Sequence, residues 1–216
     1  MDAVSAEEFL KDQVPAAVRA LIVPTLKTAY EAAQLMAKGE PILNVQSARD
    51  NRGRLISWAV DFGIEQLLKT QRWPYEYRWR DFAQPTGRYL EIRLSHAVLT
   101  ISQVANPGKQ PRNVVFRENG RLSNAPFFDL SEFDDTRAVQ GVPHFLLIHG
   151  HKNLEFAHLA VPHAVYRRDW IYKTPNLLTL PHVVPETVPP TEATEFNTAL
   201  ALKEEIEKWR KDNDVS

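Results

Sequence analysis

The sequence contains no cysteine. A disulfide framework, a thiolate metal site and a cysteine nucleophile are therefore excluded. No apolar run approaches the roughly 18 residues that a membrane-spanning helix requires. The N-terminal segment MDAVSAEEFLKDQV has no basic region followed by an apolar stretch, unlike a secretory signal. These absences predict a cytoplasmic protein that does not associate with membranes.

The sequence has no strong excess of charge of either sign. Lysine and arginine number 26, aspartate and glutamate 27, and the formal net charge is −1. No global field therefore attracts the protein to nucleic acid, so any binding of a polyanion must come from a local patch. Several familiar motifs are absent too: G-x-G-x-x-G, the P-loop, the G-x-S-x-G elbow and H-E-x-x-H.

What is present indicates a folded protein, since 44% of the residues are hydrophobic and 25% charged. The pattern predicts a single α+β domain over residues 1–216, with helices in 1–70 and a mainly antiparallel sheet, a meander, in 73–173. A proline-rich connection over 174–190 and a C-terminal helix over 191–213 complete it.

The strands are predicted from alternation of apolar and polar residues with a period of 2. RYLEIRL and AVLTISQV show this alternation, and VYRRDWIY is a further candidate strand. NVVFRENGRL is expected to form a hairpin through Asn119 and Gly120, a dipeptide suited to tight reverse turns. Residues 125–141 are acidic and are expected to form a surface loop.

Five of the seven histidines lie in the segment HFLLIHGHKNLEFAHLAVPH, residues 144–163. Within it His149, His151 and Glu155 have the order H-x-H-x₃-E, which resembles the first metal motif of cupins. That resemblance implies a bound transition metal, although the glycines that flank the cupin motif are missing here. The alternative is a hairpin through GHKN, with His149 and His151 at the tip of its turn.

A second candidate site consists of Asp81, Glu91 and Arg93. With Glu65 from the preceding helix, they resemble the PD-(D/E)XK nuclease pattern, which implies binding of Mg²⁺ or Mn²⁺ by the carboxylates. Arg93 stands where that family has lysine, and a guanidinium that stays protonated cannot act as a base. The alternative is a cross-strand ion pair that faces solvent.

Two segments combine arginine with aromatic residues: QRWPYEYRWRDF at 71–82 and YRRDWIYK at 166–173. Aromatic rings stack on bases and guanidinium groups bind phosphates, so both strips favour contact with nucleic acid. The residues predicted to bind nucleic acid are Arg72, Trp73, Arg78, Trp79, Arg80, Arg167, Arg168 and Trp170. Half-buried strands with cation–π pairs, or a protein interface, would show the same composition.

Two functional hypotheses follow from these patterns. The first is a cytoplasmic nucleic-acid-binding protein, extended in one version to a metal-dependent nuclease. The second is a non-enzymatic adaptor or regulatory subunit, with a protein partner or a second copy of the chain. A divalent metal, Mg²⁺, Mn²⁺ or a transition metal, is expected only if the protein is an enzyme.

Overall fold

The computed structural model describes residues 5–83, 87–125, 127–128, 141–166, 168–180 and 202–208. The predicted α+β architecture is confirmed: N-terminal helices precede a six-stranded sheet, and residues 202–208 are helical. The helices are α1 (Ala6–Gln13), α2 (Ala16–Ala20), α3 (Ile22–Gly39), η1 (Pro41–Asn44), α4 (Gln46–Asp50), α5 (Arg52–Lys69), α6 (Val115–Leu122) and η2 (Leu177–Thr179). The strands are β1 (Glu76–Asp81), β2 (Arg88–Arg93), β3 (Val98–Gln103), β4 (His144–His149), β5 (Ala157–Pro162) and β6 (Trp170–Lys173).

The strands lie in the order β1-β2-β3-β4-β5-β6, so every strand neighbours the next one in the sequence. Four of the pairs are antiparallel, as predicted, but β3 and β4 are parallel. Parallel neighbours need a crossover connection, because the chain must return to the end of the sheet where it started. The segment between Gln103 and His144 makes this crossover and carries α6.

The predicted hairpin through Asn119 and Gly120 is wrong. Both residues lie inside helix α6. Asn119 and Gly120 favour a turn locally, but the parallel pairing of β3 with β4 requires a connection that crosses the sheet, and this connection contains α6. The acidic-loop prediction falls mostly outside the described residues, as do residues 181–190 of the proline-rich connection and residues 191–201 and 209–213 of the C-terminal helix.

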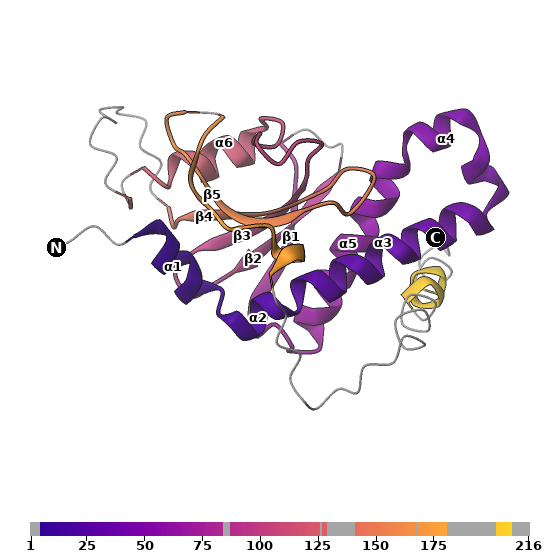
Figure 1. Ribbon diagram of the computed structural model, residues 1–216, viewed down its shortest axis with the longest axis horizontal. Coiled ribbons are helices and arrows are strands. Elements are labelled where there is room, and N and C mark those ends of the chain that lie inside the picture. The colour runs from indigo at the N-terminus through magenta and orange to yellow at the C-terminus, as the bar shows by residue number, and fades with distance from the viewer. Residues whose placement is uncertain are drawn as a thin grey trace.

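The sheet separates two layers of side chains, because successive residues of a strand point to opposite faces. One face packs on α1, α3 and α5 through residues such as Ile92, Leu99 and Leu147, and we call it the helix face. The other, the α6 face, carries Glu91, Thr100 and residues such as Leu146 and Ile148 beneath α6 and the segment that leads into it. Figure 1 shows the N-terminal helices on one side of the strands and α6 on the other.

Within the described residues, none of the helices combines the length and the apolar character needed to span a bilayer.

Candidate functional site

The histidines of residues 144–163 do not gather in one place. The predicted hairpin is confirmed by the antiparallel pair β4 and β5. Its connection runs from Gly150 to Phe156 and is longer than the predicted turn GHKN, so Leu146 lies opposite Ala160. A Cβ at Gly150 would collide with the carbonyl oxygen of Asn153, so the turn needs glycine there. By alternation His144 and His158 lie on the α6 face and His149 on the helix face.

His149 is buried, in contrast to its predicted place at the tip of a turn. Its Nδ1 lies 2.8 Å from the hydroxyl of Tyr30 on α3, which also donates a hydrogen bond to the carbonyl of Gly150. His151 and Glu155 are exposed in the turn. Across the part of the chain that is described, no three His, Asp or Glu residues are gathered to hold a metal ion, so these three residues do not form the site that the cupin motif implied.

The carboxylates of the nuclease pattern lie on opposite faces of the sheet. Arg78 pairs with Glu91 and Asp81 with Arg88 across β1 and β2, and residues 78 and 81 differ by an odd number of positions. Asp81 therefore points to the helix face and Glu91 to the α6 face. One metal ion cannot contact both through the sheet, so the predicted arrangement of Asp81 with Glu91 and Arg93 is wrong.

Glu91 instead holds two arginines of the neighbouring strand. Its side chain forms ion pairs with Arg78 and with Arg80, whose Nε lies 3.2 Å from Glu91 Oε2. Glu91 is only 8% exposed, whereas both arginines remain partly exposed at the sheet edge. Arg93 is exposed two residues further along the same face. The predicted cross-strand ion pair is thus a carboxylate that orients two guanidinium groups.

The two tryptophans of the first strip do not share a surface with these arginines, whereas the ring of Phe82 stacks on Tyr89 and Phe116 beside Arg80. Trp73 is fully buried and its Nε1 donates to the carbonyl of Val18 at 3.1 Å, so its predicted role in stacking on bases is wrong. Trp79 lies on the helix face, where its Nε1 donates to Glu65 at 2.9 Å. Arg72 is exposed just before the strand. Alternation along β1 separates Arg78 and Arg80 from Trp79.

The two strips lie at opposite edges of the sheet, since β1 and β6 are its outermost strands. Arg168 is exposed beside β6, and Trp170 packs on the apolar cluster of Leu146 and Ile148. Arg167 lies outside the described residues. The two strips therefore do not form one continuous surface.

A hollow of about 330 Å³ lies between β1–β3 and α6. Arg80 and Glu91 line it together with the rings of Tyr89 and Phe116, whose centroids are 3.8 Å apart and nearly parallel at 11°. Its lining is completed by Val98, Thr100, Asn119, Gly120, Ser123, Gly141, Val142 and His144. Sequence patterns gave no signal for this hollow, because it depends on the crossover that brings α6 over the sheet.

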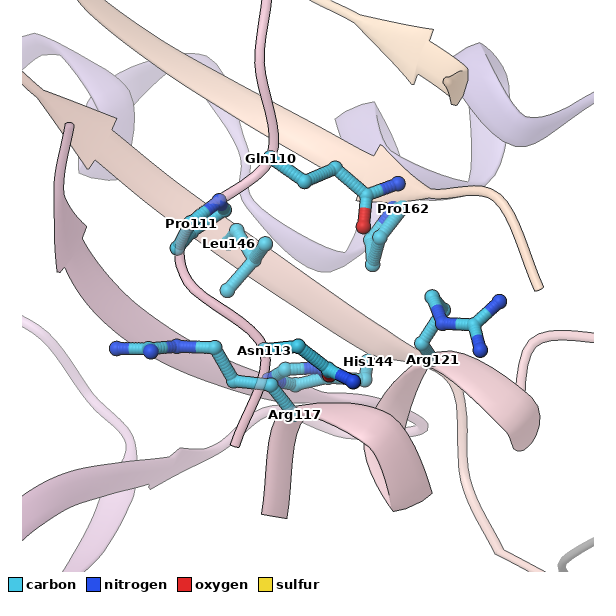
Figure 2. Close-up of a pocket in the computed structure, with 8 residues that line it drawn as sticks. All are labelled: Gln110, Pro111, Asn113, Arg117, Arg121, His144, Leu146 and Pro162. Carbon is cyan, nitrogen blue, oxygen red and sulfur yellow. The ribbon is translucent and has the colours of Figure 1, made fainter. Parts of the chain in front are cut away.

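A second, smaller cavity of about 30 Å³ lies on the same face, on the other side of His144 (Figure 2). It is lined by Gln110, Pro111, Asn113, Arg117, Arg121, His144, Leu146 and Pro162. Burial, and then the positive charge of the nearby Arg117, lower the pKa of His144 to about 4. His144 is therefore neutral at pH 7.

The side of the sheet that faces α6 has a local surplus of positive charge. Six arginines come from β1, β2 and residues 112–121, namely Arg78, Arg80, Arg93, Arg112, Arg117 and Arg121. The carboxylates of the same segments on this side are Glu76, Glu91 and Glu118. In a chain whose net charge is −1, these segments carry three more arginines than carboxylates on this side.

The sequence matches no protein-family model, and comparisons with curated proteins and with solved structures find no significant similarity.

Proposed function

We propose that the protein binds single-stranded nucleic acid across its α6 face. The observation that carries this proposal is the surplus of arginine on this face, together with a hollow of about 330 Å³ that Arg80 and two aromatic rings line. Phosphate contacts by arginine and stacking of bases on aromatic rings are the two components of such binding. The proposal concerns binding and not cleavage, because Asp81 and Glu91 point to opposite faces.

Arg78 and Arg80 are the proposed phosphate ligands at the open edge of the sheet. Glu91 contacts both guanidinium groups and so fixes their orientation before a ligand arrives. A guanidinium held in place by a carboxylate loses less side-chain entropy on binding than a free one. The single carboxylate neutralises one of the two charges, and the pair keeps one net positive charge.

The hollow is the proposed place for an unpaired base. Its volume lies at the lower end of the roughly 300–1,000 Å³ typical of small-molecule sites. Tyr89 and Phe116 supply aromatic surface, while Asn119, Ser123 and Thr100 supply hydrogen-bonding groups. Base stacking tolerates any sequence, so we expect weak sequence preference.

The test is binding of a fluorescent single-stranded oligonucleotide at several salt concentrations. We expect tight binding at low salt. The logarithm of the association constant should fall linearly with the logarithm of the salt concentration, and the steepness of this fall is the salt slope. The double variant Arg78→Ala/Arg80→Ala should lower the slope by about 1.4, since each lost phosphate contact removes about 0.7 for a single strand. No binding at low salt, or an unchanged slope, would overturn the proposal.

Two further variants control for damage to the fold. Arg88→Ala removes an arginine of the adjacent strand that pairs with Asp81 on the helix face, and it should leave binding nearly unchanged. Arg78→Ala/Arg80→Ala/Glu91→Gln avoids leaving a buried carboxylate without its cations. This triple variant should fold like the wild type and bind as weakly as the double variant.

A second candidate function is that of a protein adaptor. Trp58 on α5 is 64% exposed, and Trp79, which contacts Glu65 of the same helix, is 40% exposed. Exposed tryptophans are enriched at the centres of protein interfaces. This candidate predicts a co-purifying partner or a homo-oligomer that deletion of residues 191–216 removes. A monomer in sedimentation analysis, without a partner and indifferent to the deletion, counts against it.

A further inference from the structure

Five of the eight residues that line the small cavity beside His144 carry hydrogen-bonding side chains, and the other three, Pro111, Leu146 and Pro162, are apolar (Figure 2). Arg117 and Arg121 contribute guanidinium groups and Gln110 and Asn113 contribute amides. None of the described residues that line it carries a carboxylate. The larger hollow differs, since Glu91 lines it. The chemistry of the small cavity therefore favours an anion.

Arg117 is a partly buried cation without a counter-charge among the described residues. Its Nη1 donates to the carbonyl of Arg112 at 2.9 Å, and its guanidinium lies 4.9 Å from the centre of the Phe116 ring. Its Nε is buried and has no hydrogen-bond partner, and no described acidic group lies within ion-pair distance of it. Arg121, by contrast, pairs with Glu118 at 2.7 Å. A buried charge is expensive unless it is paired.

His144 supplies a second buried group without a partner. The residue is only 4% exposed, and its Nε2 lies 2.8 Å from the hydroxyl of Thr100, while its Nδ1 has no hydrogen-bond partner among the described residues. A Cβ at Gly120 would lie 2.5 Å from this Nδ1, so the backbone of α6 packs close beside the nitrogen. If Thr100 donates to Nε2, Nδ1 carries the proton and is a donor.

We propose that this cavity binds an oxygen of a phosphate group. Its volume of about 30 Å³ exceeds the roughly 10–15 Å³ that one water needs, so it admits one or two oxygen-sized atoms and excludes a base. Arg117 lies in the first turn of α6, where the helix dipole also favours negative charge. The source of the phosphate, a nucleic acid strand, rests on the proposed function. Free inorganic phosphate shares the same chemistry.

The first experiment uses inorganic phosphate alone. Thermal unfolding of the full chain is followed with phosphate or with chloride at equal ionic strength. Phosphate should raise the Tm of the wild type, because a ligand that binds only the folded state stabilises it. Arg117→Gln should abolish this increase. Arg88→Gln is the matched control, since its side chain is exposed on the helix face and outside the cavity, and it should keep the increase. Asn113→Ala, at an exposed lining position, serves as a second variant if Arg117→Gln does not fold.

The second experiment tests the source of the phosphate. In oligonucleotide binding, Arg117→Gln should lower the salt slope by about 0.7, the loss of one contact. If phosphate raises the Tm but no oligonucleotide binds, the cavity takes free phosphate and the nucleic-acid source is overturned. If oligonucleotides bind with an unchanged slope and phosphate has no effect on Tm, the cavity proposal is overturned while the proposed function survives. An equal Tm increase in Arg117→Gln also overturns the cavity proposal.

Discussion

The hydroxyl of Tyr30 joins helix α3 to the end of strand β4. It contacts His149 Nδ1 at 2.8 Å and donates to the carbonyl of Gly150, and all three groups are buried. Because that single proton is donated to the carbonyl, Nδ1 of His149 must carry the hydrogen of its contact with Tyr30. One side chain therefore satisfies two buried polar groups that have no access to water.

Tyr30→Phe should destabilise the protein by about 1–3 kcal/mol, because it leaves a buried N–H and a buried carbonyl without a partner. The measurement is urea unfolding at pH 7. Tyr77→Phe is the control, since no described residue forms a hydrogen bond with the Tyr77 hydroxyl, and it should change stability by much less. Equal stability of Tyr30→Phe and wild type would contradict the network.

Two buried histidines and the half-buried Asp61 give the free energy of unfolding opposite dependences on pH. Burial lowers the pKa of His144 and His149 to about 4, so the unfolded chain binds these protons first as pH falls below 6.5. Their contribution to stability is present above pH 6.5 and is lost between 6.5 and 4.

Burial, and then the charge of Glu65, raise the pKa of Asp61 to about 7. The folded state then keeps this proton up to pH 7, and stability declines as pH rises from 4 to 7.

Asp61→Asn should therefore stabilise the protein at pH 8 by roughly 1–3 kcal/mol, allowing for the partial exposure of Asp61. The difference should become small near pH 4, close to the ordinary pKa of 3.8, because the folded state is then neutral and the unfolded state only partly ionised. As pH falls below 6.5, the variant should also lose stability more steeply than the wild type. In the wild type the protonation of Asp61 partly offsets the loss that the two histidines cause, and the variant lacks this gain. Urea unfolding at pH 4, 6 and 8 checks this. Asp12→Asn, at an exposed site, is the control. A difference from wild type that is the same at all three pH values would contradict the assignment.

At the scale of elements, α6 sits on the sheet through the close approach of Gly120 to His144. A Cβ at residue 120 would lie 2.5 Å from Nδ1 and 2.8 Å from Cγ of His144. Side chains in packed interiors have no room to yield by such an amount without strain. Glycine is otherwise a poor helix residue, so its position in α6 is explained by this contact.

Gly120→Ala should lower stability by about 1–3 kcal/mol, although alanine is the better helix former. In a His144→Ala background the same substitution should become neutral or stabilising, because the clash is gone. Thermodynamic cycles from denaturant unfolding measure this coupling. Equal costs in the two backgrounds would show that the contact does not position α6.

Local patterns predicted elements well where neighbours in sequence are neighbours in space. The alternation of Leu90 and Ile92 correctly predicted a strand with one core face, and the antiparallel pairs joined by short connections were confirmed. The helix α6 was missed because the turn signal at Asn119 and Gly120 is local, whereas the parallel pairing of β3 and β4 spans some 40 residues. The connection between β4 and β5 runs from Gly150 to Phe156 and is longer than the predicted turn GHKN.

The candidate site was predicted in part for the same reason. A cross-strand ion pair was one of the two interpretations of Glu91, and the structure supplies its partners, Arg78 and Arg80 of the neighbouring strand, which the sequence analysis had not grouped with Glu91. Trp73 was misread because its indole is buried by α2, an element that no local pattern near residue 73 reveals. Arg117 and His144 come together only through the crossover. Residues within one hairpin are thus predictable, and contacts between distant elements are not.

At the scale of the whole molecule, the order of strands determines which residues can act on one ligand. β1 and β6 are separated by four strands, which places them about 24 Å apart at the usual spacing of about 4.8 Å. Arg112 and the two arginines of α6 lie over the middle of the sheet. The hollow that Arg80 lines lies between them and the β1 edge. A ligand that follows the charge would run from Arg80 toward α6.

This geometry predicts unequal roles for two exposed arginines at the two edges. For a single-stranded oligonucleotide of about eight nucleotides, within the range that small binding domains cover, Arg80→Ala should lower the salt slope by about 0.7. Arg168→Ala should leave the slope of the same oligonucleotide nearly unchanged, although both residues come from strips of similar composition. Fluorescence anisotropy at four or more salt concentrations measures both slopes. If Arg168→Ala lowers the slope as much as Arg80→Ala, the strand must reach the β6 edge, and binding would follow composition rather than the arrangement of the sheet.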